Sequence, residues 1–169
     1  LARGREHALV FFDPNARPSI MGEPSDALAS LERFIALADV VKVSDEDIEW
    51  LTGGARIDEV VDRWLGMGPS LVVVTRGKHG SDVTTASGVR FTKTPGDVEV
   101  VDTVGAGDSF MGGMIDAMWG MDLRGVNARE ALRSLPEEQV RAIIDRASAV
   151  SDVTVSRKGA NPPWAHELS

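Results

Sequence analysis

The residues best suited to chemistry lie in the stretch Val101–Phe110, where a Gly-Ala-Gly turn leads directly into Asp108. After the turn, apolar residues recur with the spacing of one helix face: Phe110, Met111, Met114, Ile115 and Met118. We therefore expect a strand, a tight loop and a helix, with Asp108 in the first helical turn. Backbone N–H groups at a helix start lack helical partners and the helix dipole is positive there, so Gly105, Ala106 and Gly107 form a candidate phosphate site. Asp108 either caps the helix or accepts a proton from an attacking hydroxyl beside bound phosphate.

A second set of polar residues follows the apolar run of residues 8–12, which predicts a buried strand. The loop after this run contains Asp13, Asn15 and Arg17 among two prolines. Open α/β sheets bind ligands at the carboxyl ends of their strands, which makes these three side chains candidate binding groups. The alternative is a surface turn in which Asp and Asn serve only the turn geometry.

An acidic cluster follows a second predicted strand, residues 39–43, in the order Ser-Asp-Glu-Asp starting at Ser44. One interpretation is a helix cap, with Ser44 as N-cap, Asp47 three residues on and glycines from Gly53 ending the helix. The other interpretation is that the acids order a magnesium–water shell near phosphates. The residue pattern leaves both interpretations open, and capping is the simpler one.

The most strand-like run, Leu71–Thr75, leads into a loop in which Gly77 and Gly80 flank Lys78 and His79. This loop predicts a second phosphate-cradling turn at a strand end, although a G-x-x-G pattern also occurs in many ordinary turns.

The remaining pattern places these loops between alternating strands and helices. Helical apolar spacing recurs in residues 24–38, 56–65, 128–135 and 137–150. Residues 81–85 and 89–94 predict an antiparallel hairpin, residues 97–101 lead into the glycine turn, and the chain from Val153 onward is expected to be loop. The alternation predicts an α/β fold with a mainly parallel sheet, helices on both faces and one edge hairpin.

Composition limits the kinds of partner. The 169 residues carry 43% hydrophobic and 26% charged side chains, which suits one domain with a substantial core. A formal charge of −8 argues against a nucleic-acid partner, and no apolar run approaches the roughly 20 residues of a membrane span. The absence of cysteine suits a reducing compartment, so we expect a cytoplasmic protein without a membrane partner. An anionic substrate would need backbone amides and a divalent cation.

Four motifs in a fixed order resemble the ribokinase-like (PfkB) carbohydrate kinases. Residues 102–110 resemble the D-T-x-G-A-G-D-x-F signature of that family. The other three are Asp13–Pro18, Lys42–Gly53 and Thr75–Gly80, and the ending Arg157–Pro163 resembles the close of the bacterial fructokinase branch. The resemblance covers essentially the whole chain and implies a three-layer α/β/α ribokinase-like fold, here incomplete.

The resemblance implies roles for the glycine turn and the acid behind it. Asp108 matches the catalytic base that takes the proton from the primary hydroxyl of a sugar. Gly105, Ala106 and Gly107 match the anion hole that neutralises charge on the transferring phosphoryl group. Both implied roles agree with the local physics of a helix start.

The other two strand-end loops match nucleotide and metal positions in the family. Thr75, Gly77 and Gly80 match the loop near the nucleotide phosphates. Ser44 and Asp47 align with the N-x-x-E pair that organises magnesium and phosphate. Because Asp47 is one methylene shorter than Glu, its implied contact with magnesium runs through water.

Cation and substrate positions are implied in the same way. Asp102 and the Val104 carbonyl fall where the family holds a monovalent cation, so the implied cofactors are Mg·ATP and K⁺. Arg17 matches a residue near the substrate or the transferred phosphate, and Asn15 and Asp13 belong to the same loop.

The largest departure from the family is an absent half. Family members carry, ahead of the first strand seen here, a segment that supplies more strands, most sugar-recognition groups and a β-rich lid. This chain opens on Leu1 without methionine. We therefore expect residues 1–169 to be the C-terminal, ATP-binding part of a longer sugar kinase or of a truncated one.

The implied activity is transfer of the ATP γ-phosphoryl group to a primary hydroxyl of a sugar, with a fructokinase-like substrate. A kinase for 2-keto-3-deoxygluconate or another sugar or nucleoside is the alternative within the family. A hypothesis of another class is a catalytically silent nucleotide-binding or assembly module, forming a homodimer or pairing with another chain through an exposed sheet edge.

Overall fold

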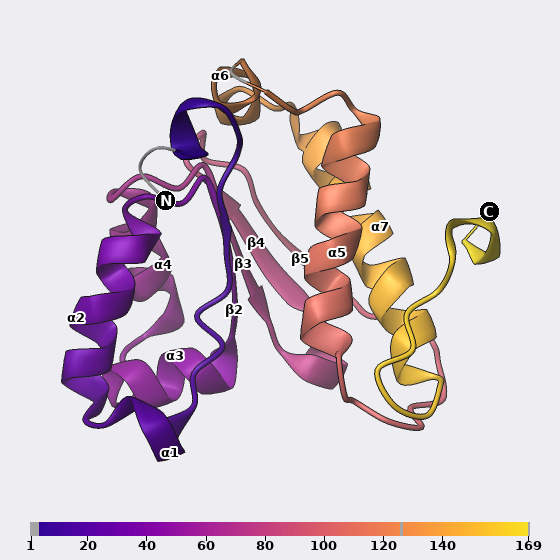
Figure 1. The fold of residues 1–169 in the computed structure, drawn as a ribbon, viewed down its shortest axis with the longest axis horizontal. Helices are drawn as coiled ribbons and strands as arrows, with labels where there is room; N and C mark the ends of the chain where they lie inside the picture. The colour runs from indigo at the N-terminus through magenta and orange to yellow at the C-terminus, as the bar shows by residue number, and fades with distance from the viewer. Residues whose placement is uncertain (1–3, 126, 169) are drawn as a thin grey trace. The chain divides into compact units, whose positions relative to one another are not determined.

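The computed structural model describes residues 4–125 and 127–168 and divides the chain into two compact units (Figure 1). The first unit contains the residues up to Thr92 together with Gly125–Ser134. The second unit contains Lys93–Arg124 and the residues from Leu135 onward.

The first unit is built on a five-stranded open sheet with the order β1-β2-β3-β4-β5. The strands are β1 (Phe11–Phe12), β2 (Val40–Ser44), β3 (Leu71–Thr75), β4 (Ser81–Thr85) and β5 (Arg90–Lys93), whose last residue belongs to the second unit. β1, β2 and β3 are parallel, and β4 returns antiparallel to β3. This confirms the predicted α/β class and the hairpin at one edge.

The helical segments of the first unit precede, connect or follow these strands. They are η1 (Gly4–Glu6), α1 (Pro18–Met21), α2 (Pro24–Ile35), α3 (Asp45–Thr52), α4 (Ile57–Leu65), η2 (Gly77–His79) and α6 (Ala128–Arg133). Proline starts α2 because its fixed φ suits the first helical turn, where its missing N–H has no helical partner. The predicted helices 24–38, 56–65 and 128–135 are confirmed with slightly shorter ends.

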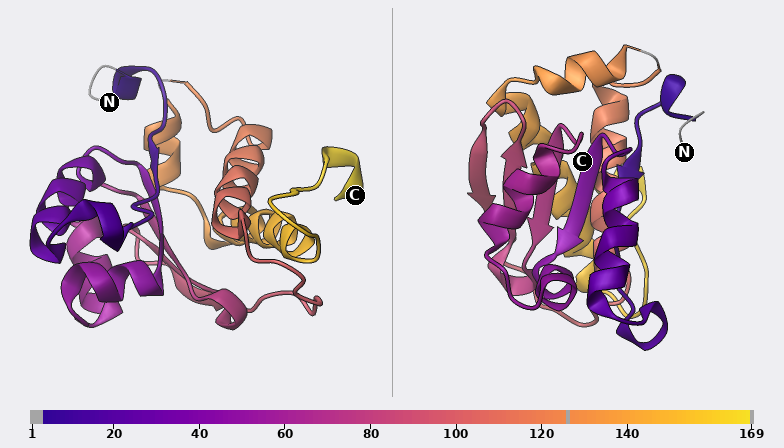
Figure 2. Two further views of the ribbon diagram at one scale, coloured as in Figure 1. Left: turned by 60° about the horizontal axis from the view of Figure 1, so that its bottom comes forward. Right: turned by 90° about the vertical axis from the view of Figure 1, so that its left-hand side faces the viewer.

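The core of the first unit lies between one face of the sheet and the helices α2 and α4 (Figure 2). Val41 and Val43 of β2 pack there with Val72 and Val74 of β3 against the fully buried Trp64 of α4. β2 and β3 are valine-rich and buried along almost their whole length, as expected of central parallel strands.

The second unit is a helix pair with a C-terminal tail. It contains α5 (Ala106–Gly120), α7 (Glu137–Val155) and η3 (Ala165–Glu167). α5 and α7 lie side by side, and a Cβ added to Gly113 of α5 would lie 2.7 Å from Cα of Ala147 on α7. Glycine is therefore required at position 113 for this close helix packing.

Three predicted boundaries are wrong. β1 holds only Phe11 and Phe12 of the predicted strand 8–12, because the N–H of Val10 donates to the Asp39 carboxylate at 2.8 Å instead of to a strand. The strand expected directly before the glycine turn does not form, since the N–H of Val101 donates to the Val155 carbonyl at 2.8 Å.

The third wrong boundary concerns the C-terminal segment that was expected to be loop from Val153. α7 continues to Val155, because Thr154 extends the buried side of the helix and is 0% exposed. Its Oγ1 donates to the Val150 carbonyl at 2.8 Å, within the same helix.

None of the helices in the described ranges is long and apolar enough to cross a membrane.

Candidate active site

The glycine turn before α5 needs a residue without a side chain at its start. Gly105 has φ +78°, in the left-handed region that glycine enters without steric cost. A Cβ at this position would also lie 2.8 Å from Cβ of Ala160. Both the backbone angle and the neighbouring loop therefore require glycine, and the turn brings three consecutive peptide groups to the start of α5.

The donors at this helix start differ from the prediction in one position. The prediction counted the N–H of Ala106 as a free donor. In the structure it donates to the Thr103 carbonyl at 3.2 Å. Within residues 4–125 and 127–168, the N–H groups of Gly105, Gly107 and Asp108 have no recorded backbone or side-chain acceptor. The Asp108 amide is a donor that the motif analysis missed, although its place in the first helical turn indicates it.

The carboxylate of Asp108 is exposed and accepts no hydrogen bond from any described residue. Asp108 therefore makes no capping hydrogen bond within the described residues, and its role as a base stays a prediction. Asp108 lines a cavity of about 540 Å³ in the second unit, together with Gly112 and Asp116 of α5, Arg146 of α7 and Pro162 of the tail. A carboxylate at the rim of a cavity beside free N–H donors can reach both an anion and a nearby hydroxyl.

Asp102 joins two loops of the second unit through its carboxylate. Its Oδ1 accepts the Val104 N–H at 3.1 Å and its Oδ2 accepts the Gly159 N–H at 2.8 Å. These hydrogen bonds, the one from Val104 first, lower the pKa of Asp102 below its usual value. The sequence pattern did not predict Gly159 as a partner of Asp102, because the two residues lie more than fifty positions apart. The carboxylate stays charged at neutral pH, and two oxygen donors, from Asp102 and the Val104 carbonyl, suit a hard cation.

We predict that Asp102→Asn lowers the melting temperature at neutral pH and that this difference shrinks in acid. A carboxyl whose folded pKa is depressed stabilises the fold above its unfolded pKa of about 3.9, and that contribution is lost as the pH falls through the folded pKa. Melting curves of both proteins across the acid range provide the measurement. Asp97→Asn is the matched control, because it removes the same charge from an exposed side chain for which the described residues record no hydrogen bond. Equal losses for the two variants at neutral pH would contradict this role of Asp102.

In the first unit, Ser44 is the N-cap of α3. This agrees with the capping interpretation of the acidic cluster. Ser44 Oγ accepts the Asp47 N–H at 3.0 Å, and Gly53 ends the helix in the left-handed conformation. Across the described ranges, no three His, Cys, Asp or Glu side chains gather as a possible metal cluster. Asp47 is half-buried, and as a single carboxylate it suits Mg²⁺ that keeps waters and phosphate ligands.

The loop after β3 has the turn geometry expected from its glycines. Gly77 and Gly80 have φ of +51° and +87°, and the Gly80 N–H donates to the Gly77 carbonyl at 3.0 Å. Thr75 Oγ1 donates to the Val43 carbonyl at 3.3 Å, which fixes the end of β3 to β2. The N–H groups of Gly77 and Lys78 have no recorded acceptor in the described part of the chain. The loop can therefore offer two backbone donors to an anion.

The loop after β1 is organised by a residue that the sequence analysis did not select. Lys42 of β2 is 5% exposed, and its Nζ lies 2.6 Å from Oδ2 of Asp13. The other oxygen of Asp13 accepts the Asn15 N–H at 3.2 Å, as in an Asx turn. Arg17 donates to the Asn15 and Ala16 carbonyls. Turn geometry thus accounts for much of this loop, and Lys42 could have been found as a lone lysine within an apolar strand.

Comparison with known proteins identifies the chain's family. A family model described as pfkB family carbohydrate kinase matches residues 2–167. The chain belongs to the PfkB family. The resemblance carried by the four motifs is confirmed. A fructokinase of Rhizobium leguminosarum bv. trifolii is 33% identical over 142 residues, which cover 83% of this chain and 42% of that relative.

Solved PfkB structures have the same fold. The aminoimidazole riboside kinase of Salmonella enterica, complexed with aminoimidazole riboside and an ATP analog, matches with a TM-score of 0.74 and 26% identity. That match covers 95% of this chain and 50% of the other. A fructokinase of Vibrio cholerae O395, in a form with bound fructose, ADP and potassium ion, matches with a TM-score of 0.69 and 29% identity, covering 90% of this chain and 46% of the other. This chain thus spans half or less of the length of these three relatives.

Proposed function

We propose that this PfkB chain is the C-terminal, ATP-binding part of a sugar kinase that transfers a phosphoryl group to a primary hydroxyl. One observation carries the proposal: the exposed Asp108 directly follows a glycine turn. Among the described residues, its carboxylate accepts no hydrogen bond and the N–H groups of Gly105 and Gly107 have no acceptor. Helix starts of this kind bind phosphate through oriented amides and the helix dipole.

In the proposed reaction, each group of the site has one task. The N–H groups of Gly107 and Asp108 donate to oxygens of the transferring phosphoryl group and offset its negative charge. The Asp108 carboxylate accepts the proton of the attacking hydroxyl as the new P–O bond forms and the bond to the ATP leaving group breaks. Gly105 keeps the turn in the left-handed conformation that directs these amides outward.

Two cations belong to the proposal. Mg²⁺ would be held mainly by ATP phosphates and water, with Asp47 contacting the water shell, and it would neutralise phosphate charge. K⁺ would be held by Asp102 and the Val104 carbonyl, beside the proposed anion hole. The loops with Ser44, Thr75, Gly77 and Gly80 would hold the nucleotide.

The proposed acceptor is a ketose such as fructose, because the relative from Rhizobium leguminosarum bv. trifolii is named a fructokinase. 2-Keto-3-deoxygluconate is the main competing acceptor, since its kinases share a D-x-N-x-R loop like the one with Asp13, Asn15 and Arg17. A nucleoside is a third acceptor class, because one similar structure is an aminoimidazole riboside kinase complexed with aminoimidazole riboside.

The proposal is tested by a coupled enzyme assay that measures the rate of ADP release with each of these acceptors. We expect turnover that requires Mg·ATP and is highest with fructose. Highest turnover with 2-keto-3-deoxygluconate or a nucleoside would reassign the substrate and keep the kinase. Absence of turnover with every acceptor would reject kinase activity for this chain alone.

A second candidate function is a nucleotide-binding or assembly module without turnover. It is favoured by β1, a two-residue strand at the edge of the sheet that a strand of another chain can pair with. Calorimetry with Mg·ATP separates the candidates, because binding without turnover supports the module and turnover by the isolated chain rejects it.

A further inference from the structure

The first unit contains a cavity that none of the proposed catalytic or nucleotide-binding residues line. Its volume is about 520 Å³, and it lies between α4 and the β4–β5 hairpin. This volume falls within the range of roughly 300–1,000 Å³ that is typical of small-molecule sites. The cavity is therefore large enough for a compact metabolite.

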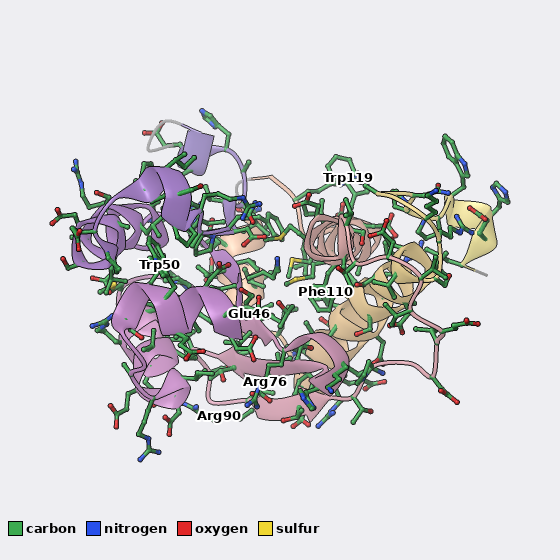
Figure 3. The ribbon with its side chains drawn as sticks, turned by 90° about the horizontal axis from the view of Figure 1, so that it is seen from below. Glu46, Trp50, Arg76, Arg90, Phe110 and Trp119 are labelled. Atoms are coloured by element: carbon green, nitrogen blue, oxygen red, sulfur yellow. The ribbon has the colours of Figure 1, made fainter. Side chains whose placement is uncertain are left out.

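Three arginines from different parts of the fold line this cavity: Arg56 before α4, Arg76 after β3 and Arg90 on β5. Figure 3 places Arg76 and Arg90 at the side of the unit where α4 faces the hairpin. Two of the described residues in the lining carry carboxylates, Asp58 and Asp82. The lining thus carries three positive and two negative side chains, while Glu59 and Asp62 pair with Arg56 and Arg90 from outside the lining.

The arginines are held by exposed ion pairs that an anionic ligand can replace. Arg56 Nη2 lies 2.6 Å from Asp58, Arg76 Nη1 lies 2.8 Å from Asp82, and Arg90 pairs with Asp62. Exposed pairs of this kind contribute little to stability. A phosphate dianion carries more charge than a carboxylate and matches the planar guanidinium fork with two parallel hydrogen bonds.

The rest of the lining suits the body of a small sugar. Ile57, Val61 and Val74 give an apolar wall. Thr84 and Thr92 also line the cavity, and Thr92 Oγ1 donates to Asp82 Oδ1 at 2.7 Å. Apolar walls with a few placed polar groups are typical of sites for small ligands.

We propose that this cavity binds a phosphate monoester of a small sugar, as a site separate from the nucleotide loops. Arg76 connects the two regions, because its Nε also lies 3.9 Å from Oδ2 of Asp45, the first residue of α3. A ligand phosphate that draws Arg76 toward the cavity loosens it from Asp45, next to the proposed nucleotide residue Ser44. Occupancy of the cavity therefore changes the affinity for Mg·ATP.

Calorimetry at low ionic strength with glucose 6-phosphate as probe tests the site. We expect saturable binding that weakens at least tenfold in Arg56→Gln and in Arg90→Gln. Arg133→Gln is the matched control, because it removes one positive charge from an exposed position of α6, outside the cavity. Amide shifts at Phe91 and Thr92 on titration locate the ligand at the hairpin.

Each outcome decides the proposal independently of kinase activity. No saturable binding, or equal affinity in the two cavity variants and the wild type, overturns the site. Inorganic phosphate binding as tightly as glucose 6-phosphate overturns the sugar-ester assignment, and tight binding of glucose overturns the role of the arginines. Mg·ATP affinity measured with and without the probe tests the coupling, and an unchanged value overturns it.

Discussion

Asp108→Asn should lower turnover by about 10²- to 10⁴-fold in an active kinase that contains this chain, the range expected when a general base is removed. The amide keeps the size of the side chain and the backbone N–H of residue 108, so the donors of the helix start remain. What is lost is the group that accepts the proton from the sugar hydroxyl. Steady-state kinetics with calorimetric titration of Mg·ATP measure both effects, and we expect the affinity for Mg·ATP to stay within a few-fold of the wild type.

Asp145→Asn on α7 is the matched control, because it removes the same charge from an exposed residue of the same unit, paired only with Lys93 at 2.6 Å in the described structure. Its turnover should equal that of the wild type. Near-normal turnover in Asp108→Asn would remove Asp108 from the role of base. A parallel loss of Mg·ATP affinity would instead assign Asp108 to nucleotide binding.

The sequence predicted most of the local features that carry this proposal. The periodic apolar residues predicted α5, the valine runs predicted β2 and β3, and the cap at Ser44 formed as the residue types indicated. Each of these features depends on neighbours within a few residues, where residue type and period are strong signals.

The features that the sequence did not predict depend on partners far along the chain. Residues 97–101 are rich in β-branched side chains, yet Val101 bonds to Val155, and Val100 is 57% exposed. The pairing of Lys42 with Asp13 spans 29 residues, and that of Asp102 with Gly159 spans 57. Such contacts follow from the fold, and a local pattern carries no information about them.

The buried Asp39 forms a charge cluster with partners far along the chain. Of the contacts named here, this cluster has the largest expected effect on stability. Asp39 is 1% exposed. Its carboxylate accepts from Arg129 Nε at 2.5 Å and from Arg129 Nη2 at 3.0 Å, across 90 residues. It also accepts the Val10 N–H at 2.8 Å and lies 3.6 Å from Arg5 Nη2. Hydrogen bonding to Asp39 raises the pKa of Arg129, so the guanidinium stays charged at neutral pH.

Asp39→Ala should therefore lower the free energy of unfolding by about 3–5 kcal/mol, the range measured when one partner of a buried ion pair is removed. The loss leaves the Arg129 guanidinium without its counterion and the Val10 N–H without an acceptor, and both costs exceed the value of the lost contact itself. Urea unfolding at neutral pH, with the midpoint and slope fitted together, gives the measurement.

Two further variants separate the charge cluster from a general sensitivity to mutation. Asp58→Ala removes an exposed carboxylate that pairs with Arg56 in the same unit, and its unfolding midpoint should stay close to that of the wild type. Asp39→Asn keeps an oxygen that can accept the Val10 N–H, so its free energy of unfolding should lie between those of Asp39→Ala and the wild type.

Because Asp39 and Arg129 act as one unit, the double variant Asp39→Ala, Arg129→Ala should lose less free energy of unfolding than the two single variants combined. Strict additivity would show that the two side chains stabilise the fold separately.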